Sequence, residues 1–154
     1  MPTFEVLHKG MDWSEGPLQL PDGRVICSDV PRNHILVYDK GKTEVYLDNS
    51  GSSPPNYSNE QGSNGLHLDQ ENRLLLCQHG ARRVVRMEAP LDAPAHEFTV
   101  LADNYRGKRF NSPNDLVIAK DGSILFTDPI YGLPGQGDSP PREMDYCGVF
   151  RIDP

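Results

Sequence analysis

The chain contains an internal repeat of about fifty residues. At an offset of 50, residues 64–68 align with residues 114–118 without a gap, and at an offset of 49 Glu15 aligns with Asn64. Each unit opens with an apolar strand of period two, which is followed by a turn and a second apolar strand. Such a unit cannot bury both faces of its own sheet, so it has to stack on neighbouring units.

The repeat predicts an all-β chain of four-stranded antiparallel propeller blades. Helical periodicity is absent, and the first strand, around Leu18, is one residue out of phase with its later copies. Three blades are expected, over residues 15–48, 64–102 and 114–154, and the third stops after three strands. Third strands are expected at residues 34–38, 83–87 and 148–152, and fourth strands at residues 43–47 and 98–101.

A ring of radial blades needs at least about four of them. Three incomplete blades therefore predict either a longer protein or a ring that another chain completes. Residues 1–10 are expected to form a strand that closes the ring with the missing last blade. The loops over residues 49–63 and 103–113 are rich in Ser, Pro, Asn and Gly, and long loops on a rigid scaffold often carry function.

The charge of the chain excludes several classes of partner. There are 22 acidic and 15 basic side chains, for a net charge of -7. A protein that binds nucleic acid or an anionic membrane needs clustered basic residues, whereas the basic runs here, at residues 82–86 and 106–109, are short, and we interpret them as solvated charges. No apolar stretch approaches a membrane span, and the N-terminus lacks the pattern of a signal peptide. We expect no nucleic-acid partner, no membrane partner and a cytoplasmic location.

Three oxygen-bearing side chains stand at the equivalent position that opens the inner strand of each repeat. They are Glu15, Asn64 and Asn114. Inner strands surround the central channel of a propeller, so these side chains are expected to converge. One carboxylate and two amide carbonyls are hard ligands that suit calcium. The alternative is that Asn and Glu before Gly only begin strands or form turns.

A second set of polar residues follows the return strands, at Asp29, Gln78 and Asp128. The hairpin arithmetic places them roughly level with the first set, where they could orient the ligands or bind substrate. Equally, they could cap the loops that follow. His79 comes directly after Gln78 and could reach the cavity, whereas His67 lies in mid-strand and is expected to be packed or exposed.

The ordered motifs of the chain resemble the gluconolactonase branch of the family that includes senescence marker protein (regucalcin) and luciferin-regenerating enzyme. The motifs are Glu15-Gly16-Pro17, Ser63-Asn64-Gly65-Leu66, Cys77-Gln78-His79-Gly80, Phe110-Asn111-Ser112-Pro113-Asn114-Asp115 and Phe126-Thr127-Asp128-Pro129. They span nearly the whole chain in the family's order.

The resemblance implies a six-bladed propeller that holds one divalent metal, usually calcium, and hydrolyses sugar lactones. Glu15 matches the family's metal-binding glutamate, and Asn114 matches an asparagine that touches metal or substrate. Asn64, Asp128 and His79 are expected on the substrate side. The family's remaining ligands, including the aspartate favoured as general base, have no counterpart before Pro154.

Two other functions remain open at this point. An organophosphate hydrolase of the diisopropylfluorophosphatase type would use the same propeller and metal on another substrate. A half-propeller without catalytic activity would instead serve as a binding module, or would pair with a second chain.

Overall fold

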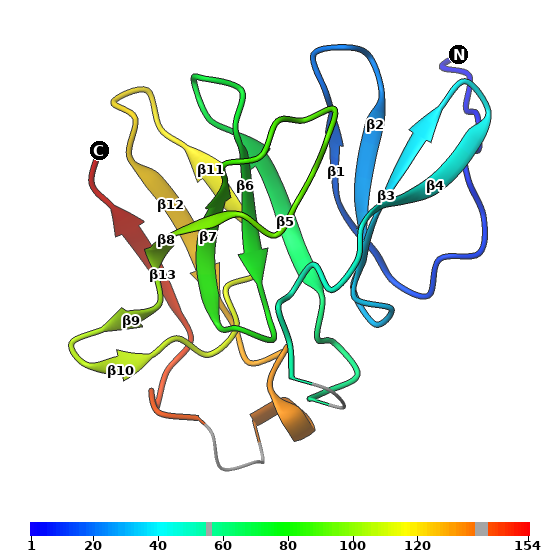
Figure 1. Ribbon diagram of the computed structural model, residues 1–154. Helices are drawn as coiled ribbons and strands as arrows, with labels where there is room; N and C mark the ends of the chain where they lie inside the picture. The colour runs from blue at the N-terminus through cyan, green and yellow to red at the C-terminus, as the bar shows by residue number, and fades with distance from the viewer. Residues whose placement is uncertain (55–56, 138–141) are drawn as a thin grey trace.

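A computed structural model of the chain describes residues 1–54, 57–137 and 142–154. The strands form three antiparallel blades that stand side by side, and no α-helix occurs in these residues (Figure 1). Blade 1 contains β1 (Ser14–Gln19), β2 (Val25–Asp29), β3 (His34–Asp39) and β4 (Lys42–Leu47). Blade 2 contains β5 (Ser63–Leu68), β6 (Leu74–Gln78), β7 (Arg83–Met87) and β8 (Phe98–Ala102). Blade 3 contains β11 (Leu116–Ile118), β12 (Ile124–Asp128) and β13 (Gly148–Ile152).

These blades confirm the predicted fold class, which is a partial β-propeller. The strands of each blade follow one another in chain order, and the inner strand β5 contacts both β1 and β11. Their bounds lie within two residues of the predicted ranges, although residues 138–141 of the third range are outside the described residues.

The phase difference of the first strand has a packing cause. The hairpins of blades 1 and 2 contain the same β-bulge, so their backbones are in register although their apolar residues are not. Leu18 and Leu20 of blade 1 and Leu66 and Leu68 of blade 2 meet in one core cluster. Successive side chains of a strand point to opposite faces, so the two blades turn opposite faces toward each other.

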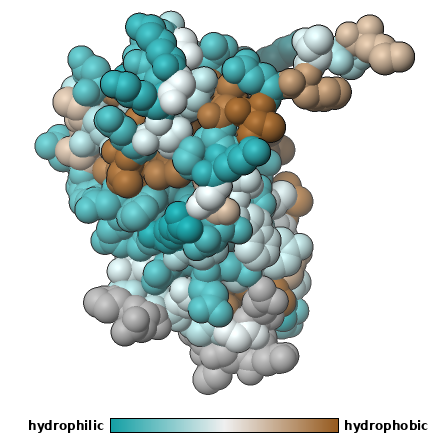
Figure 2. Space-filling view, turned by 90° about the vertical axis from the view of Figure 1, so that its right-hand side faces the viewer, coloured by the Kyte–Doolittle hydropathy of each residue, from teal (hydrophilic) through white to brown (hydrophobic). Residues whose placement is uncertain are grey.

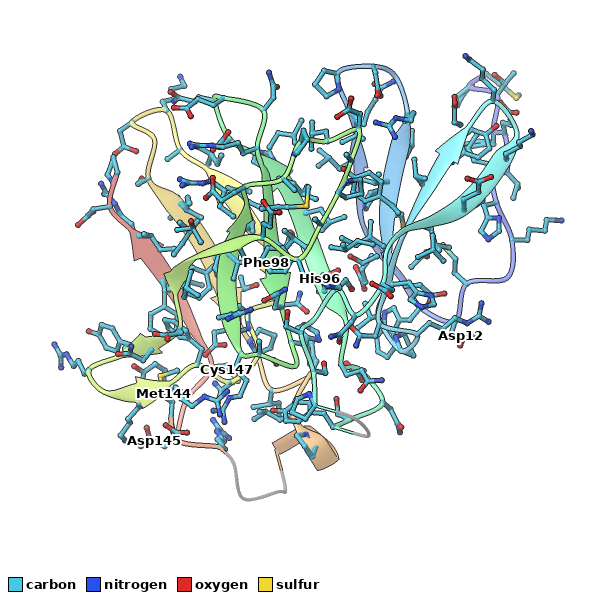
Figure 3. The ribbon with its side chains drawn as sticks, in the orientation of Figure 1. Asp12, His96, Phe98, Met144, Asp145 and Cys147 are labelled. Carbon is cyan, nitrogen blue, oxygen red and sulfur yellow. The ribbon has the colours of Figure 1, made fainter. Side chains whose placement is uncertain are left out.

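A second core lies between blades 2 and 3. Leu75, Cys77 and Val84 of blade 2 pack here, and the whole of β6 is buried because blade 2 has a neighbour on each face. The rings of Phe110, Phe126 and Phe150 lie 5.0 to 5.4 Å apart. The loop residue Met144 completes the second core, and Phe98, the first residue of β8, packs against the first core (Figure 3).

The structure forms no strand before Ser14, whereas the sequence predicts one within residues 1–10. Phe4 in this segment is 93% exposed. A β-strand needs a hydrogen-bonded neighbour, and the predicted neighbour is a blade outside this chain. The ring-closing role of the segment therefore stays a prediction. Figure 2 shows apolar areas on the side of the molecule that blade 1 forms, where Val45 is exposed.

Two small elements were not expected from the sequence. The predicted loop at 103–113 contains a ribbon of β9 (Asn104–Tyr105) and β10 (Lys108–Arg109), and a 3-10 helix, η1, spans Pro134–Gly137. Arg106 and Gly107 both have positive φ, as the two-residue hairpin turn between β9 and β10 requires. No helix among the described residues is long and apolar enough to cross a membrane.

The inner strands approach one another closely through two glycines. A Cβ built on Gly16 would lie 2.5 Å from the backbone oxygen of Asn64. A Cβ built on Gly65 would lie 2.8 Å from the backbone oxygen of Asn114 and 2.7 Å from Cα of Asp115. The Gly65 amide donates a hydrogen bond of 2.6 Å to that Asn114 oxygen. A side chain at either glycine would therefore push neighbouring blades apart.

We predict that Gly65→Ala destabilises the protein by about 3 kcal/mol, because its Cβ would meet backbone atoms that cannot move independently. Gly107→Ala is the matched control: nothing lies within 4 Å of its Cβ, so its cost of about 1 kcal/mol comes from positive φ alone. Urea unfolding measures both. A smaller loss for Gly65→Ala than for Gly107→Ala would contradict the close-approach account.

Candidate functional site

The three residues that open the inner strands line one hollow of about 300 Å³. Glu15 lies on β1, Asn64 lies on β5, and Asn114 lies two residues before β11. The other lining residues are Gly16, Pro17, Leu66, His67, Asp115 and Leu116. His67 therefore lines the hollow, whereas the sequence predicted a packed or exposed side chain. Leu66, its neighbour on β5, lines the hollow and also packs in the core cluster of blades 1 and 2.

Asn64 and Asn114 are joined directly. Asn64 Nδ2 donates a hydrogen bond of 2.9 Å to Asn114 Oδ1. The backbone oxygen of Asn64 accepts a 2.8 Å hydrogen bond from the buried Ser28 hydroxyl of blade 1. Ser28 is a site-supporting residue that the sequence reasoning missed, and no repeat signal marks it. These bonds limit the rotation of both amides at the point where the blades meet.

Glu15 has a different neighbour. Its Oε1 accepts a hydrogen bond of 2.9 Å from the indole Nε1 of Trp13, and its backbone oxygen lies 3.3 Å from the Cys27 thiol. The carboxylate therefore stands at the wall of the hollow with one oxygen already bonded.

His79 is fully buried and does not line the hollow. Its Nδ1 lies 3.0 Å from the backbone oxygen of Glu60. Burial lowers the pKa of His79 to about 4, so the ring is neutral at neutral pH. Asn114 lies next to the ring, but Nε2 makes no hydrogen bond within the described part of the chain. His79 therefore lies beside Asn114 and does not line the hollow.

The second set of polar residues holds loops. Strand pairing places Asp29 opposite Ser14 and Gln78 opposite Ser63, which is one residue away from the level that the hairpin arithmetic predicts. Asp29 Oδ1 accepts hydrogen bonds from the amides of the two residues before Ser14. Gln78 Nε2 donates a hydrogen bond of 2.8 Å to the backbone oxygen of Ser50.

Asp128 holds the loop that leads to Asn114. Its Oδ2 accepts a 2.8 Å hydrogen bond from the amide of Asn111, whose Nδ2 in turn donates to the backbone oxygen of Asp128. Arg82, which the sequence reasoning treated as solvated, is buried and donates 2.6 Å from Nε to the backbone oxygen of Phe110. Its φ of 59° turns it inward at the end of blade 2. Asp128 and Arg82 thus fix residues 110–112 from two sides.

Burial raises the pKa of the Asp128 carboxyl to about 6, although the Asn111 and Ser112 amides oppose the shift. Oδ1 of this carboxyl is buried and has no hydrogen-bond partner within the described residues. The folded protein therefore favours the protonated acid more than the unfolded chain does.

The hollow is suited to a hard cation. Its repeat-equivalent residues offer one carboxylate and two amides, and Asp115 at its wall adds a second carboxylate. Oxygen ligands of this kind fit calcium better than zinc or copper. Within residues 1–54, 57–137 and 142–154, no three His, Cys, Asp or Glu side chains form a metal cluster. A metal held in the hollow would therefore depend on amides as well as on carboxylates.

A larger cleft of about 410 Å³ lies between blades 2 and 3 at the hairpin turns. Its floor is apolar, and the charged residues at its rim pair with one another: Arg73 binds Asp69 and Glu71, and Arg151 binds Asp121. These mutual pairs leave no converging set of ligands there. The smaller hollow at the inner strands is the better candidate site.

Comparison with known proteins decides the family. A family model described as "SMP-30/Gluconolactonase/LRE-like region" matches residues 13–154. The chain belongs to this family. This confirms the resemblance drawn from the sequence motifs.

Several known proteins are similar to this chain. A gluconolactonase of Zymomonas mobilis subsp. mobilis is 37% identical over 98% of this chain. The structure of a gluconolactonase from Xanthomonas campestris is 34% identical, with a TM-score of 0.77 over 96% of this chain. A luciferin-regenerating enzyme, at 15% identity and a TM-score of 0.60 over 92% of this chain, shows a likeness of fold alone.

This family member spans less than half the length of those relatives. It covers 43% of the Zymomonas protein, 46% of the Xanthomonas protein and 45% of the luciferin-regenerating enzyme. What the complete relatives do is therefore attributed to this chain only as a proposal.

We predict that Asp128→Asn changes the pH dependence of stability. Because the folded pKa of Asp128 is raised, its contribution to stability is fully present below pH 3.8 and is lost as the pH rises through 6. Between pH 4 and 7 the free energy of unfolding of the wild type should therefore fall by up to about 3 kcal/mol relative to that of Asp128→Asn. Above pH 7 it should fall little further. Asn keeps an acceptor for the Asn111 amide.

Denaturant unfolding of both proteins across this pH range measures the difference. Asp22→Asn is the matched control: the backbone amide of Arg24 holds the pKa of Asp22 below its usual value, so the wild type should lose no stability relative to this variant in the same range. A constant difference between the wild type and Asp128→Asn from pH 4 to 7 would show that Asp128 titrates normally.

Proposed function

We propose that this chain forms half of a divalent-metal-dependent hydrolase that opens sugar lactones. The observation that supports this proposal most is that Glu15, Asn64 and Asn114 line one hollow. The chain also belongs to a family whose description includes gluconolactonase. The relatives of known name point to the same substrate class. Because the chain spans less than half of them, the activity is proposed for the propeller that includes the remaining half.

Calcium is the metal we propose. Glu15 and Asn114 would hold it through their oxygens, and Asn64, bonded to Asn114, would lie beside it toward the substrate. When bound, calcium would polarise the lactone carbonyl and stabilise the negative charge that develops on its oxygen. The two ligand residues of this half are fewer than the six to eight oxygens that calcium takes, so the other half and water would complete the shell.

The other residues of the chain would act by orientation. The Asn64 to Asn114 hydrogen bond fixes how the amides face the hollow, and the substrate's hydroxyl groups can bond to the remaining amide groups and to His67. Asp128 and His79 would act on substrate only indirectly. Asp128 holds the loop before Asn114, and His79 lies behind that residue.

We predict that Glu15→Gln lowers lactone hydrolysis about 100-fold or more, because a metal without its carboxylate binds weakly and supplies less charge stabilisation. Removal of the metal with a chelator should abolish activity, and added calcium should restore it. A pH-indicator assay with gluconolactone measures both effects. It is run on the 154-residue chain and on the chain extended by the half that its relatives possess.

Glu44→Gln is the matched control, since Glu44 is exposed on β4 away from the hollow, and it should keep full activity. Lactone hydrolysis that continues in the presence of the chelator would contradict the metal-dependent mechanism. Faster hydrolysis of a fluorophosphate than of gluconolactone would instead favour the organophosphate hydrolase. A well-folded extended protein that hydrolyses neither substrate would favour a binding module.

A further inference from the structure

Trp13 stands one residue before β1 and two residues before Glu15. It lies in the bend that leads into β1. The indole Nε1 donates a hydrogen bond of 2.9 Å to Glu15 Oε1. The ring is 45% exposed, so the core does not account for its position. The bond to the carboxylate is the one specific polar interaction that the indole makes in the described residues.

The backbone of Trp13 is held on both sides, by Asp29 at the end of β2 and by Val30 directly after it. Its amide donates to Asp29 Oδ1 at 3.3 Å, and its carbonyl accepts from the amide of Val30 at 3.1 Å. Asp29 is fully buried, so this anchor is rigid. The indole is therefore presented to Glu15 from a fixed backbone, through a chain of contacts from Asp29 to Trp13 to Glu15.

We propose that Trp13 is a positioning residue for the cation site. Its N–H occupies Oε1 of Glu15, which leaves Oε2 to face the hollow and directs the carboxylate to bind through one oxygen. A second-sphere donor of this kind restricts the rotation of the carboxylate before the ion arrives. This inference rests on the proposed function, because it concerns how the same metal is held. It also gives Asp29 a role two contacts away from the ion.

The chain offers an internal probe, because Trp13 is its single tryptophan. In a nitrogen-15 NMR spectrum of the metal-free protein, the one indole N–H signal should move when Glu15→Ala removes the acceptor. It should move less with Glu15→Gln, which keeps an oxygen. An indole signal that is the same in wild type and Glu15→Ala would show that the hydrogen bond is absent in solution and would overturn the proposal.

The effect on metal binding is measured with terbium and calcium on the chain extended by the half that its relatives possess. Trp13→Phe keeps an aromatic ring and removes only the N–H, so we expect it to raise the Kd for both ions about 10-fold or more. Tyr46→Phe is the matched control: it also loses one hydrogen bond, to the backbone oxygen of Leu91, but lies away from the hollow. Its Kd should equal that of the wild type.

The outcomes separate this proposal from the proposed function. Unchanged metal affinity in Trp13→Phe, with tight binding in the wild type, would overturn the role of Trp13 and leave the metal-dependent lactonase intact. No binding by the wild type at millimolar metal, together with an intact indole hydrogen bond, would overturn both, since there would be no ion to position. A 10-fold loss in Trp13→Phe alone supports the role.

Discussion

The close approach of the inner strands is the constraint on which the rest of the structure depends. Gly16 and Gly65 leave no room for a side chain between the backbones of adjacent blades. Because of this contact, residues 49 and 50 positions apart in the chain become neighbours in space. Glu15, Asn64 and Asn114 each adjoin such a contact, so the packing of the blades and the geometry of the site have the same origin.

The site is built from the ends of strands rather than from flexible loops. Ser28 reaches from blade 1 to the backbone of Asn64, and Asn64 reaches through its side chain to Asn114. Loops support this arrangement from outside, through Asp29 beneath Trp13 and through Asp128 and Arg82 around residues 110–112. Several buried polar groups that look like ligands in the sequence thus act as anchors for the segments that carry the ligands.

The sequence predicted the features that follow from the repeat. It missed the features that depend on single contacts between distant residues. The repeat located the three blades and the equivalent positions of Glu15, Asn64 and Asn114, because blade stacking imposes one register on every unit. It placed Asp29 and Gln78 roughly level with Glu15 and Asn64, and the observed pairing differs by one residue because the bulges in β1 and β5 are invisible in an apolar pattern. The buried place of Arg82 depends on a positive φ and a distant carbonyl, which no local pattern encodes.

The central claim is that three repeat-equivalent residues form one cation site at the meeting point of the blades. A crystal structure of the protein with bound calcium, or with a lanthanide located by its anomalous scattering, tests it most directly. The account predicts one ion in the hollow, about 2.3–2.6 Å from oxygens of Glu15 and Asn114. An ion found elsewhere, or one in the hollow without Glu15 among its ligands, would contradict the account.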